Sequence, residues 1–504
     1  MKILTPSQLQ KTDAYTIEHQ QISSWELMER ASLAALKEIK NITLNPQPVT
    51  VLAGSGNNGG DGLAIAYHLD QLGYKVNVLL LKYTPKLSKD CKINLDRLKA
   101  NTSINIQEYI DTSSIEDLKI ESIIIDAVFG IGLNRTLPNF VEKIISSANK
   151  RTALRIAVDL PSGLFLSKLT PENAKVFKAE YTLTFQCPKL NFFLPAYGND
   201  LGEIKIIDIG LDQDFIDHLE TEYEYVDEKF ITKFYKTRQR FSHKGNYGHL
   251  LIVGGQYGMM GSVSLAAKSA LKSGVGKVTV LSPKCGVEVL QQSVPEAMVI
   301  AADQNESVSP KELKFEPSNI CIGMGLGQSE QALGTLKYFI TEAKTPMLID
   351  ADGINLLAQN KDFLKALPAQ SILTPHQGEL KRLIGEWQDD YDKLEKVKSF
   401  VKTYNVILVA KDAYTFIASQ DKIYINSTGN AGLATAGSGD TLSGIISSFL
   451  CQKYLPIEAS ILGVYAHGKA ADIYANKYDE NSLIASDIIK YLKNVFLQLK
   501  SHKH

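Results

Sequence analysis

The chain has 504 residues, 44% of them hydrophobic and 22% charged, with a formal net charge of −1. This length predicts about two to four domains, and the composition is that of a globular protein. The near-neutral charge argues against a nucleic-acid or anionic-membrane binder. We find no apolar run of about 18 residues for a membrane span and no signal-peptide core near residue 1. The five scattered cysteines include no CxxC pair, which fits a reducing cytoplasm and argues against a disulfide framework or a structural zinc site.

The first part of the chain predicts a helix, a strand, a glycine-rich loop and a second helix. Residues 27–39 carry apolar residues at helical spacing, and residues 49–53 form an apolar run typical of a buried strand. The run leads into GSGNNGGDG at 54–62, and a helical pattern returns at 63–72. This order of elements is the one that cradles a phosphate. The loop matches neither the strict GxGxxG fingerprint nor a Walker A loop.

Further short apolar runs predict a parallel sheet covered on both faces: 74–81, 122–125 and 154–158. The last two runs end in Asp126 and Asp159, where an open parallel sheet binds its ligands. Together with Asn58, these aspartates would suit a hard cation or a proton-transfer site. The alternative is that they cap turns at the strand ends.

The boundary between two domains is predicted near residue 222. Residues 181–210 are interpreted as a final hairpin or strand pair, and residues 211–229 are acidic with no clean helix or strand period. We therefore assign one domain to 1–222 and a second to 223–504.

The second half predicts another alternation of strands and helices. A helix is expected at 263–274, and strands at 249–253, 277–281, 320–322, 347–349, 371–373 and 406–410. Each strand leads into glycine, a carboxylate, a lysine or a histidine. The two halves share this style without a residue-level repeat.

One small-residue stretch, 426–444, points to anion binding. It holds five glycines and a single carboxylate, Asp440, and an apolar helical run follows it. Glycines let a ligand approach the backbone, and a helix N-terminus favours an anion. A carboxylate beside a phosphate needs a task there, and proton abstraction from a hydroxyl is such a task. The alternative is that Asp440 merely caps the helix.

The motifs resemble two families that are found fused. Residues 1–210 resemble the NAD(P)H-hydrate epimerase domain through LMERAS (27–32), GSGNNGGDG (54–62), DAVFGIGLNR (126–135) and DLPSG (159–163). Residues 240–500 resemble the ADP/ATP-dependent NAD(P)H-hydrate dehydratase domain through GGQYGMMGSVSLAAKSALKSGVGKV (254–278), GMGLG (323–327), DADGIN (350–355), TPHQGE (374–379) and NAGLATAGSGDTLSG (430–444). The chain as a whole is similar to the bifunctional nicotinamide nucleotide repair family.

The resemblance implies a fold and an activity. The fold class is α/β, with two three-layer domains, the first Rossmann-like and the second ribokinase-like. The first would interconvert the R and S forms of hydrated NAD(P)H, and the second would dehydrate the S form to NAD(P)H with ADP or ATP. The implied cofactors are K⁺ in the first domain and Mg²⁺ with the nucleotide in the second. We expect these small molecules as partners, no nucleic acid or membrane, a homo-oligomer and a cytoplasmic location.

The same resemblance implies the site residues. Asp159 and Asp440 are the expected catalytic groups. Contacts to the hydrate in the epimerase domain fall on Asn57, Asn58, Gly59, Gly60, Asp61, Gly130, Ile131, Gly132, Leu133, Asn134, Arg135, Thr136 and Asp159. The K⁺ positions are Asn58, Asp126 and Ser162. In the dehydratase domain the residues expected to contact the hydrate are Met260, Gly325, His376 and Asp440. Those expected to contact the nucleotide are Lys411, Asp412, Ala413, Tyr414, Thr415 and Gly439.

Two positions depart from the family pattern, and a second function stays open. The family usually has glycine where this chain has Asp412, and proline where it has Gln377. A carboxylate pointing at bound phosphates would weaken nucleotide binding. The family's histidine is present as His376. The alternative to a binding role is that His376 is a structural histidine. The competing function is a ribokinase-like small-molecule kinase whose first domain is a non-catalytic nucleotide-binding scaffold.

Overall fold

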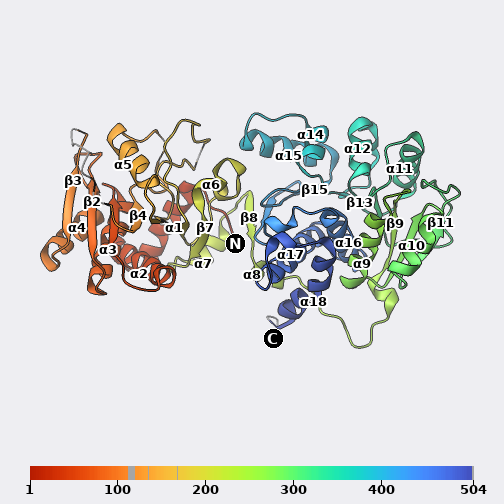
Figure 1. Cartoon of the computed structure of the whole chain (residues 1–504), viewed down its shortest axis with the longest axis horizontal. Coiled ribbons are helices and arrows are strands. Elements are labelled where there is room, and N and C mark those ends of the chain that lie inside the picture. The colour runs from red at the N-terminus through yellow and green to blue at the C-terminus, as the bar shows by residue number, and fades with distance from the viewer. Residues whose placement is uncertain (112–117, 119, 134, 167, 502–504) are drawn as a thin grey trace. The chain divides into compact units, whose positions relative to one another are not determined.

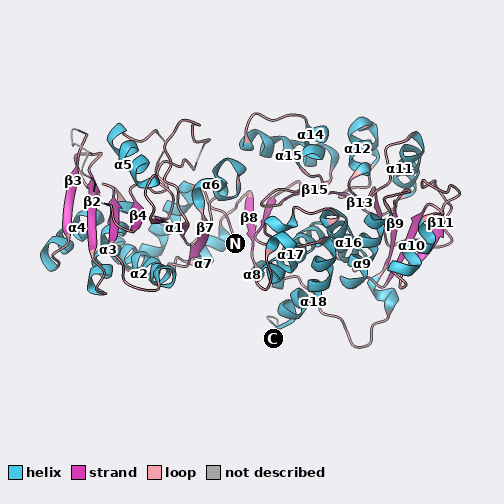
Figure 2. Ribbon diagram, in the orientation of Figure 1, coloured by secondary structure: helices cyan, strands magenta, loops and turns pink. Residues whose placement is uncertain are grey.

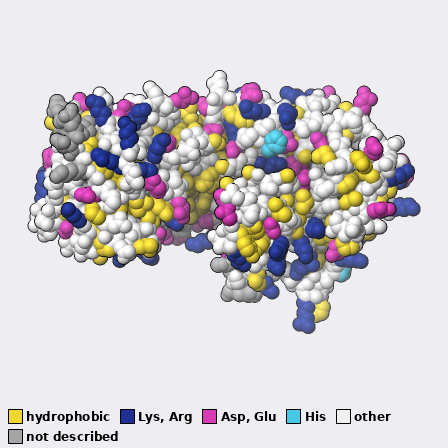
Figure 3. Space-filling model, in the orientation of Figure 1, with side chains coloured by type: hydrophobic (Ala, Val, Ile, Leu, Met, Phe, Trp, Pro, Cys, Tyr) yellow, Lys and Arg dark blue, Asp and Glu magenta, His cyan; other side chains and the backbone are white. Residues whose placement is uncertain are grey.

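The computed structural model describes residues 1–111, 118, 120–133, 135–166 and 168–501. Contacts divide the chain into two compact units, one of residues 2–221 and the other of residue 1 with the chain from 222 onward. Within the described ranges, no helix combines the length and the apolar character that crossing a membrane requires. Charged side chains of both signs are scattered over the face that Figure 3 shows.

The first unit is built on a parallel sheet. In the described residues its strand order is β3-β2-β1-β4-β5-β6-β7, and every neighbouring pair is parallel. The order reverses between β1 and β4, which is where doubly wound sheets bind ligands. The strands are β1 (Val49–Ala53), β2 (Val76–Leu81), β3 (Asn105–Tyr109), β4 (Ile123–Ala127), β5 (Leu154–Val158), β6 (Tyr181–Phe185) and β7 (Glu203–Ile207).

Helices cover both faces of this sheet. Side chains alternate along a strand, so Val51 and Leu52 of β1 belong to two different hydrophobic cores. Helices α2, α3 and α4 contribute to the Val51 core, and α5 contributes to the Leu52 core. Figure 2 shows the strands and the helices around them. The helices are α1 (Pro6–His19), α2 (Ser24–Thr43), α3 (Asn57–Gln71), α4 (Lys89–Asn101), α5 (Asn139–Asn149), α6 (Gly198–Leu201) and α7 (Gln213–His218).

The glycine-rich stretch 54–62 is mostly helix rather than loop, so that prediction was wrong in part. Helix α3 begins at Asn57, and only the first three residues of the stretch form the turn. A Cβ on Gly59 would lie 2.0 Å from the carbonyl oxygen of Gly54. A Cβ on Gly62 would lie 2.5 Å from the Cβ of Ala127 in β4. These glycines therefore let the first turns of α3 lie directly on the turn and the sheet.

Of the hairpin or strand pair expected at 181–210, the strand pair is confirmed and the hairpin is wrong. Strands β6 and β7 pair in parallel, because short helices between Leu190 and Leu201 carry the chain back to the start of the sheet. Both strands therefore end on the edge where β1, β4 and β5 end.

The second unit contains a longer sheet. In the described residues its order is β11-β10-β9-β12-β13-β14-β15-β16-β17-β8, parallel from β11 to β15 and antiparallel at β15-β16 and β16-β17. The strands are β8 (Tyr223–Val226), β9 (His249–Val253), β10 (Lys277–Ser282), β11 (Met298–Ala301), β12 (Asn319–Ile322), β13 (Leu348–Ile349), β14 (Ile372–Leu373), β15 (Ile407–Ala410), β16 (Phe416–Ala418) and β17 (Ile423–Asn426).

Regular structure occurs in the acidic segment 211–229, where the sequence indicated none. The segment holds α7, β8 and the start of α8, and β8 pairs in parallel with β17 at the sheet edge. Strand β8 is short and of intermediate burial, and its partner strand lies about 200 residues away in the sequence. The local sequence therefore shows no alternation of apolar and polar residues that would predict it.

Two groups of helices flank the second sheet. Helices α9, α16, α17 and α18 share one hydrophobic core with strand residues such as Leu250 and Val278. Figure 1 shows α11, α12, α14 and α15 on the other side of the strands. The α/β three-layer architecture predicted for both domains is confirmed. The helices are α8 (Glu228–Thr232), α9 (Met260–Lys272), α10 (Gly286–Ser293), α11 (Glu330–Glu342), α12 (Asp352–Gln359), α13 (Lys361–Ala366), α14 (Gln377–Ile384), α15 (Asp390–Tyr404), α16 (Ser438–Cys451), α17 (Pro456–Ala475) and α18 (Ala485–Ser501).

Candidate active sites

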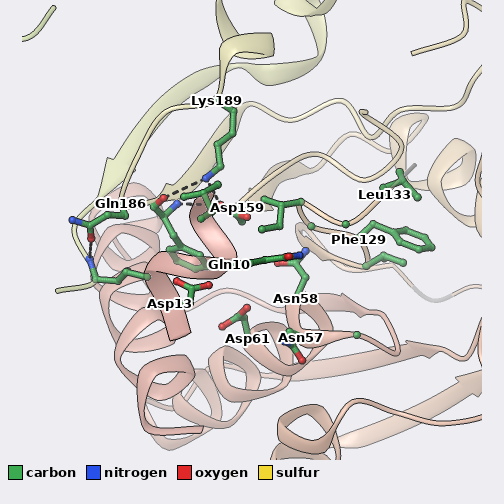
Figure 4. A pocket seen from close by; sticks show the side chains of 18 of the residues that line it. Gln10, Asp13, Asn57, Asn58, Asp61, Phe129, Leu133, Asp159, Gln186 and Lys189 are labelled. Carbon is green, nitrogen blue, oxygen red and sulfur yellow. Dashed lines mark hydrogen bonds and ion pairs between the residues drawn. The ribbon is translucent and has the colours of Figure 1, made fainter. Parts of the chain in front are cut away.

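A cavity of about 580 Å³ opens at the carboxyl edge of the first sheet (Figure 4). The segments after β1, β4, β5, β6 and β7 line it, and α1 closes it from the side. The predicted residues that line it are Asn57, Asn58, Asp61, Gly130, Ile131, Gly132, Leu133, Arg135 and Asp159. Gly59 and Gly60 are instead buried in α3, Thr136 is not part of the lining, and Asn134 lies outside the described residues.

Asp159 is held in one orientation at the end of β5. Its backbone has a φ of 63°, and its N–H donates to the carbonyl of Leu183 at 2.7 Å. Its Oδ1 accepts hydrogen bonds from Lys189 Nζ (2.6 Å), from Thr184 Oγ1 (3.3 Å) and from the N–H of Phe185 (3.2 Å). Within the part of the chain that the structure describes, its Oδ2 accepts no hydrogen bond. That oxygen is therefore available to a bound molecule.

Lys189 is a functional candidate that sequence reasoning missed. Its side chain is 3% exposed, lines the cavity, and pairs with Asp159 while also donating to Thr184 Oγ1 at 2.6 Å. Figure 4 shows Lys189 reaching toward Asp159, with Asp13 and Asp61 farther along the cavity. Lys189 follows the end of β6, so the strand-end rule would have found it if β6 had been recognised as a parallel strand.

Two partly buried carboxyl groups face the Asp159–Lys189 pair. Asp13 of α1 was also missed, because a lone aspartate on a helix has no sequence signal. Burial and the charge of Asp159 raise the pKa of Asp13 to about 6, against the opposing effect of Lys189. Burial, followed by the charges of Asp159 and Asp13, raises the pKa of Asp61 well above its usual value. The cavity therefore combines an ion-paired carboxylate with carboxyl groups that hold protons more tightly.

The residues expected to hold K⁺ fit a monovalent cation. Asn58 is buried, and neither its Oδ1 nor its Nδ2 has a hydrogen-bond partner among the described residues. Asp126 is fully buried and accepts from the N–H and the Oγ of Ser162, both at 2.7 Å. Ser162 Oγ in turn accepts from the N–H of Phe129, and Gly130 lies against Asn58. One carboxylate, one unpaired amide and one hydroxyl, from the segments at the ends of β1, β4 and β5, are hard oxygen ligands of low total charge.

The second unit has a cavity of about 860 Å³. Its walls are the β15–β16 turn, the segment after β17, the first turn of α16, and α17. The predicted residues that line it are His376, Lys411, Asp412, Ala413, Tyr414, Thr415 and Gly439. Sequence reasoning missed His467 of α17, which also lines it and whose Nε2 lies 3.2 Å from Ser438 Oγ. Burial lowers the pKa of His467 to about 4, so its ring is neutral near pH 7.

The first turn of α16 borders this cavity without a side-chain cap. The residue before the helix, Gly437, has a left-handed φ of 81°, and no side chain caps the N-terminus. A Cβ on Gly439 would lie 3.4 Å from Lys411 Nζ and 3.7 Å from Asp350 Oδ2. An anion at Gly439 would therefore meet both the helix N-terminus and the lysine.

Asp440 lies in the same first turn and has an altered proton affinity. Burial, and then the charge of Asp350, raise the pKa of Asp440 to about 6, although Ser262 donates a hydrogen bond to it. Asp350 itself pairs with Lys411 at 3.1 Å and accepts from Ser443 Oγ at 2.7 Å. Burial opposes ionisation of Asp350, but Lys411 and Ser443 outweigh it and lower the pKa of Asp350. Asp440 is therefore a carboxyl group that exchanges protons near pH 6, and Glu379, whose pKa burial raises to about 7, is a second one nearby.

Three of the four residues expected to contact the hydrate do not line this cavity: Met260, Gly325 and Asp440. Met260 is the first residue of α9 and is buried in the hydrophobic core, with its Sδ close to Gly255. Gly325 has a φ of 56° and lies against the backbone of Met259. Both lie close to Ser262, which reaches Asp440. Asp440 thus stands between the start of α9 on one side and Lys411 on the other.

His376 has a structural contact as well as a place in the lining. Its Nδ1 accepts the N–H of Gly378 at 3.0 Å and caps α14, while its own N–H donates to Glu379 Oε2 at 2.9 Å. Its ring is 57% exposed. Burial, and then the charge of Lys411, lower the pKa of His376. The structural interpretation and the binding interpretation are therefore compatible.

The two departures from the family pattern contact each other. Asp412 Oδ2 accepts hydrogen bonds from Gln377 Nε2 and from Lys393 Nζ, the latter at 3.0 Å. The carboxylate is therefore charge-compensated rather than left to repel a phosphate.

Similarity to known proteins covers almost the whole chain. Residues 24–191 match the family model described as YjeF-related protein N-terminus, and residues 250–494 match the model described as NAD(P)H-hydrate dehydratase. The bifunctional NAD(P)H-hydrate repair enzyme Nnr of Moorella thermoacetica is 31% identical, over 99% of this chain and 97% of that protein. The enzyme of the same name from Escherichia coli is 32% identical, over 94% and 90%.

Among solved structures, a ribokinase-like superfamily protein from Enterococcus faecalis superposes with a TM-score of 0.50 and 26% identity, over 56% of this chain and 98% of that one. The resemblance indicated by the motifs is thereby confirmed for both halves. With two family models matched in order and full-length relatives above 30% identity, the chain belongs to the family of bifunctional NAD(P)H-hydrate repair enzymes.

Proposed function

We propose that the first unit interconverts the R and S forms of hydrated NAD(P)H and that the second dehydrates the S form with ADP or ATP. The observation that carries this proposal is Asp440, a partly buried carboxyl group with a raised pKa, in the first turn of α16 beside Lys411. A kinase would use a similar base. Membership of the repair family, with both halves matched, favours dehydration over the kinase alternative.

The dehydration follows from the groups around Asp440. A ring hydroxyl is a poor leaving group, so the reaction needs to convert it to a phosphate. Asp440 takes the hydroxyl proton as the oxygen attacks the terminal phosphorus of the nucleotide. Lys411 and the N-terminus of α16 stabilise negative charge on the transferring group. Mg²⁺ bound with the nucleotide would offset charge on its phosphate oxygens.

The second half of that reaction removes the phosphate. The C–O bond breaks, inorganic phosphate leaves with the electron pair, and the ring nitrogen stabilises the cation that remains. The neighbouring carbon then gives up a proton, which restores the ring double bond of NAD(P)H. The nucleotide is released with one phosphate fewer.

The epimerisation follows from the Asp159–Lys189 pair. Water adds to an enamine so that the hydroxyl stands on the carbon bonded to nitrogen, and the R and S forms differ at that carbon. Asp159 Oδ2 takes the hydroxyl proton, the C–N bond breaks and an aldehyde forms, while Asp13 donates a proton to the ring nitrogen. Rotation of the aldehyde group presents its other face to the nitrogen, and the reverse steps close the ring with the opposite configuration. The hydroxyl oxygen recovers its proton from Asp159, and the ring nitrogen returns its proton to Asp13.

The remaining groups of the first cavity support binding. The uncapped first turn of α3, which follows Gly56, suits the pyrophosphate of the substrate. The rings of Tyr83 and Phe129 stack at 4.3 Å between centroids and offer a flat apolar wall to a base. Asn58, Asp126 and Ser162 would hold K⁺, whose charge would offset that of the phosphates. A homo-oligomer and a cytoplasmic location stay predictions.

The proposal is tested with hydrated NADH and each nucleotide. With ADP or ATP we expect NADH absorbance to appear at the expense of the S form, and the R form to follow as it epimerises. Asp440→Asn slows NADH formation by about 100-fold or more and leaves R–S interconversion unchanged. Accumulation of a phosphorylated product without NADH would instead establish the kinase alternative.

A further inference from the structure

A small polar cluster joins two loops of the second cavity. Asp412 follows Lys411 in the β15–β16 turn, Gln377 is the first residue of α14, and Lys393 lies in α15. Asp412 Oδ2 accepts from both of the other side chains, with Lys393 Nζ at 3.0 Å. Its Oδ1 accepts the N–H of Ala413 at 2.9 Å. Both oxygens of this carboxylate are therefore engaged within the protein.

The lysine of this cluster is buried. The Lys393 side chain is 7% exposed, compared with 20% for Asp412, and its Nζ lies 5.6 Å from the centre of the Trp387 ring. A buried ammonium group is strongly disfavoured unless a partner neutralises it. The pair therefore ties the β15–β16 turn to α15.

The glutamine joins the turn to the segment that carries His376. Gln377 Nε2 also lies 3.3 Å from the carbonyl oxygen of Lys411, and the N–H of Lys411 donates to the carbonyl of Pro375 at 2.9 Å. Gln377 immediately follows His376, which lines the same cavity as Lys411. One hydrogen-bond network thus joins the segment of His376 to that of Lys411. This network fixes the backbone from which the Lys411 side chain extends.

We infer that Lys393, Asp412 and Gln377 form a positioning cluster that holds the nucleotide-contacting turn 411–415 and determines nucleotide affinity. This inference rests on the proposed function, since it requires that the second cavity binds ADP or ATP. The cluster keeps the Asp412 charge away from the phosphates and keeps Lys411 at Gly439, where the transferring phosphoryl group would lie. Preorganisation of this kind strengthens binding without contact between the cluster and the chemistry.

The test measures nucleotide binding and catalysis separately. Binding of Mg·ADP and of Mg·ATP is measured by calorimetry for the wild type, Asp412→Gly, Gln377→Ala and Lys393→Met, and NADH formation gives KM and kcat. We expect each variant to raise the Kd and the KM for nucleotide about tenfold, with kcat within about threefold of the wild type. Asp362→Asn, which removes an exposed carboxylate from the same unit, is the matched control and changes neither value.

A double variant separates positioning from simple destabilisation. Asp412→Gly leaves Lys393 unpaired, so its unfolding temperature falls. Adding Lys393→Met removes that charge and restores the unfolding temperature, while the Kd for nucleotide stays raised. If the double variant also recovers wild-type affinity, or if all three single variants bind nucleotide as the wild type does, the inference is overturned. Gln377→Ala leaves no unpaired buried charge, so its nucleotide affinity tests the positioning cluster even if the other variants fail to fold.

Failure of the inference is distinguishable from failure of the proposed function. A wild-type protein that binds neither nucleotide would contradict the function proposed for the second cavity. A wild-type protein that binds nucleotide and forms NADH, with variants that match it, would contradict the positioning cluster alone.

Discussion

Replacing Lys189 by methionine tests whether the first cavity works through an oriented carboxylate. The substitution keeps most of the side-chain volume and removes the Nζ that donates to Asp159 and Thr184, both at 2.6 Å. The side chains of Lys189 and Asp159 are 3% and 13% exposed. The variant therefore leaves a nearly buried carboxylate with no cation beside it.

The magnitude follows from that burial. Removing one partner of a buried ion pair costs about 3 kcal/mol of folding free energy. For a unit of this size such a loss lowers the unfolding temperature by about 10 °C. Asp159 also loses its fixed orientation, and loss of a positioned base slows proton transfer about 100-fold. We therefore expect slow R–S interconversion in a protein that still folds at 25 °C.

The assay follows the R and S forms of hydrated NADH by chromatography without nucleotide, so that the dehydratase reaction cannot consume either form. Lys205→Met, which removes an exposed lysine paired with Glu203 on β7, is the matched control and keeps the wild-type rate. The double variant Asp159→Asn/Lys189→Met recovers part of the lost stability, because no unpaired charge remains. An unchanged interconversion rate in Lys189→Met would refute the role assigned to the pair.

Three further predictions concern other groups. The raised pKa of Asp440 means that folding favours its protonated form, so Asp440→Asn unfolds at a higher temperature than the wild type at pH 7.5 but not below about pH 4. Wild-type dehydration falls as the pH drops through about 6, because Asp440 then becomes protonated. Calorimetry measures the unfolding temperatures and a pH–rate profile measures the dehydration, and equal unfolding temperatures at pH 7.5 would contradict the burial argument. Gly59→Ala brings a Cβ to 2.0 Å from Gly54 O and lowers the unfolding temperature by about 10 °C, whereas Gly198→Ala, with open space around it, changes it little; similar melting of the two variants would count against the close packing of α3. Exchanging K⁺ for a bulky organic cation slows R–S interconversion about tenfold and leaves dehydration unchanged, and a cation-independent rate would show that Asn58 and its neighbours hold no such ion.

The sequence alone determined the local elements and the family. Strands 49–53, 154–158 and 249–253 were predicted with the bounds that the structure shows, because a buried strand in a parallel sheet is a short apolar run between turn residues. Asp159 was predicted at a strand end and lines the cavity there. Local patterns carry this information, since periodicity and turn chemistry depend on neighbouring residues.

Only the tertiary structure decided which distant side chains meet. Lys189 reaches Asp159 because β6 is parallel to β5, and Asp13 reaches both because α1 packs at that edge of the sheet. Likewise Asp412, which the sequence indicated as a possible hindrance to phosphates, is neutralised by Lys393 of another helix and by Gln377. Strand order, strand direction and helix packing arise from contacts between residues far apart in the chain, and these leave no period in the sequence.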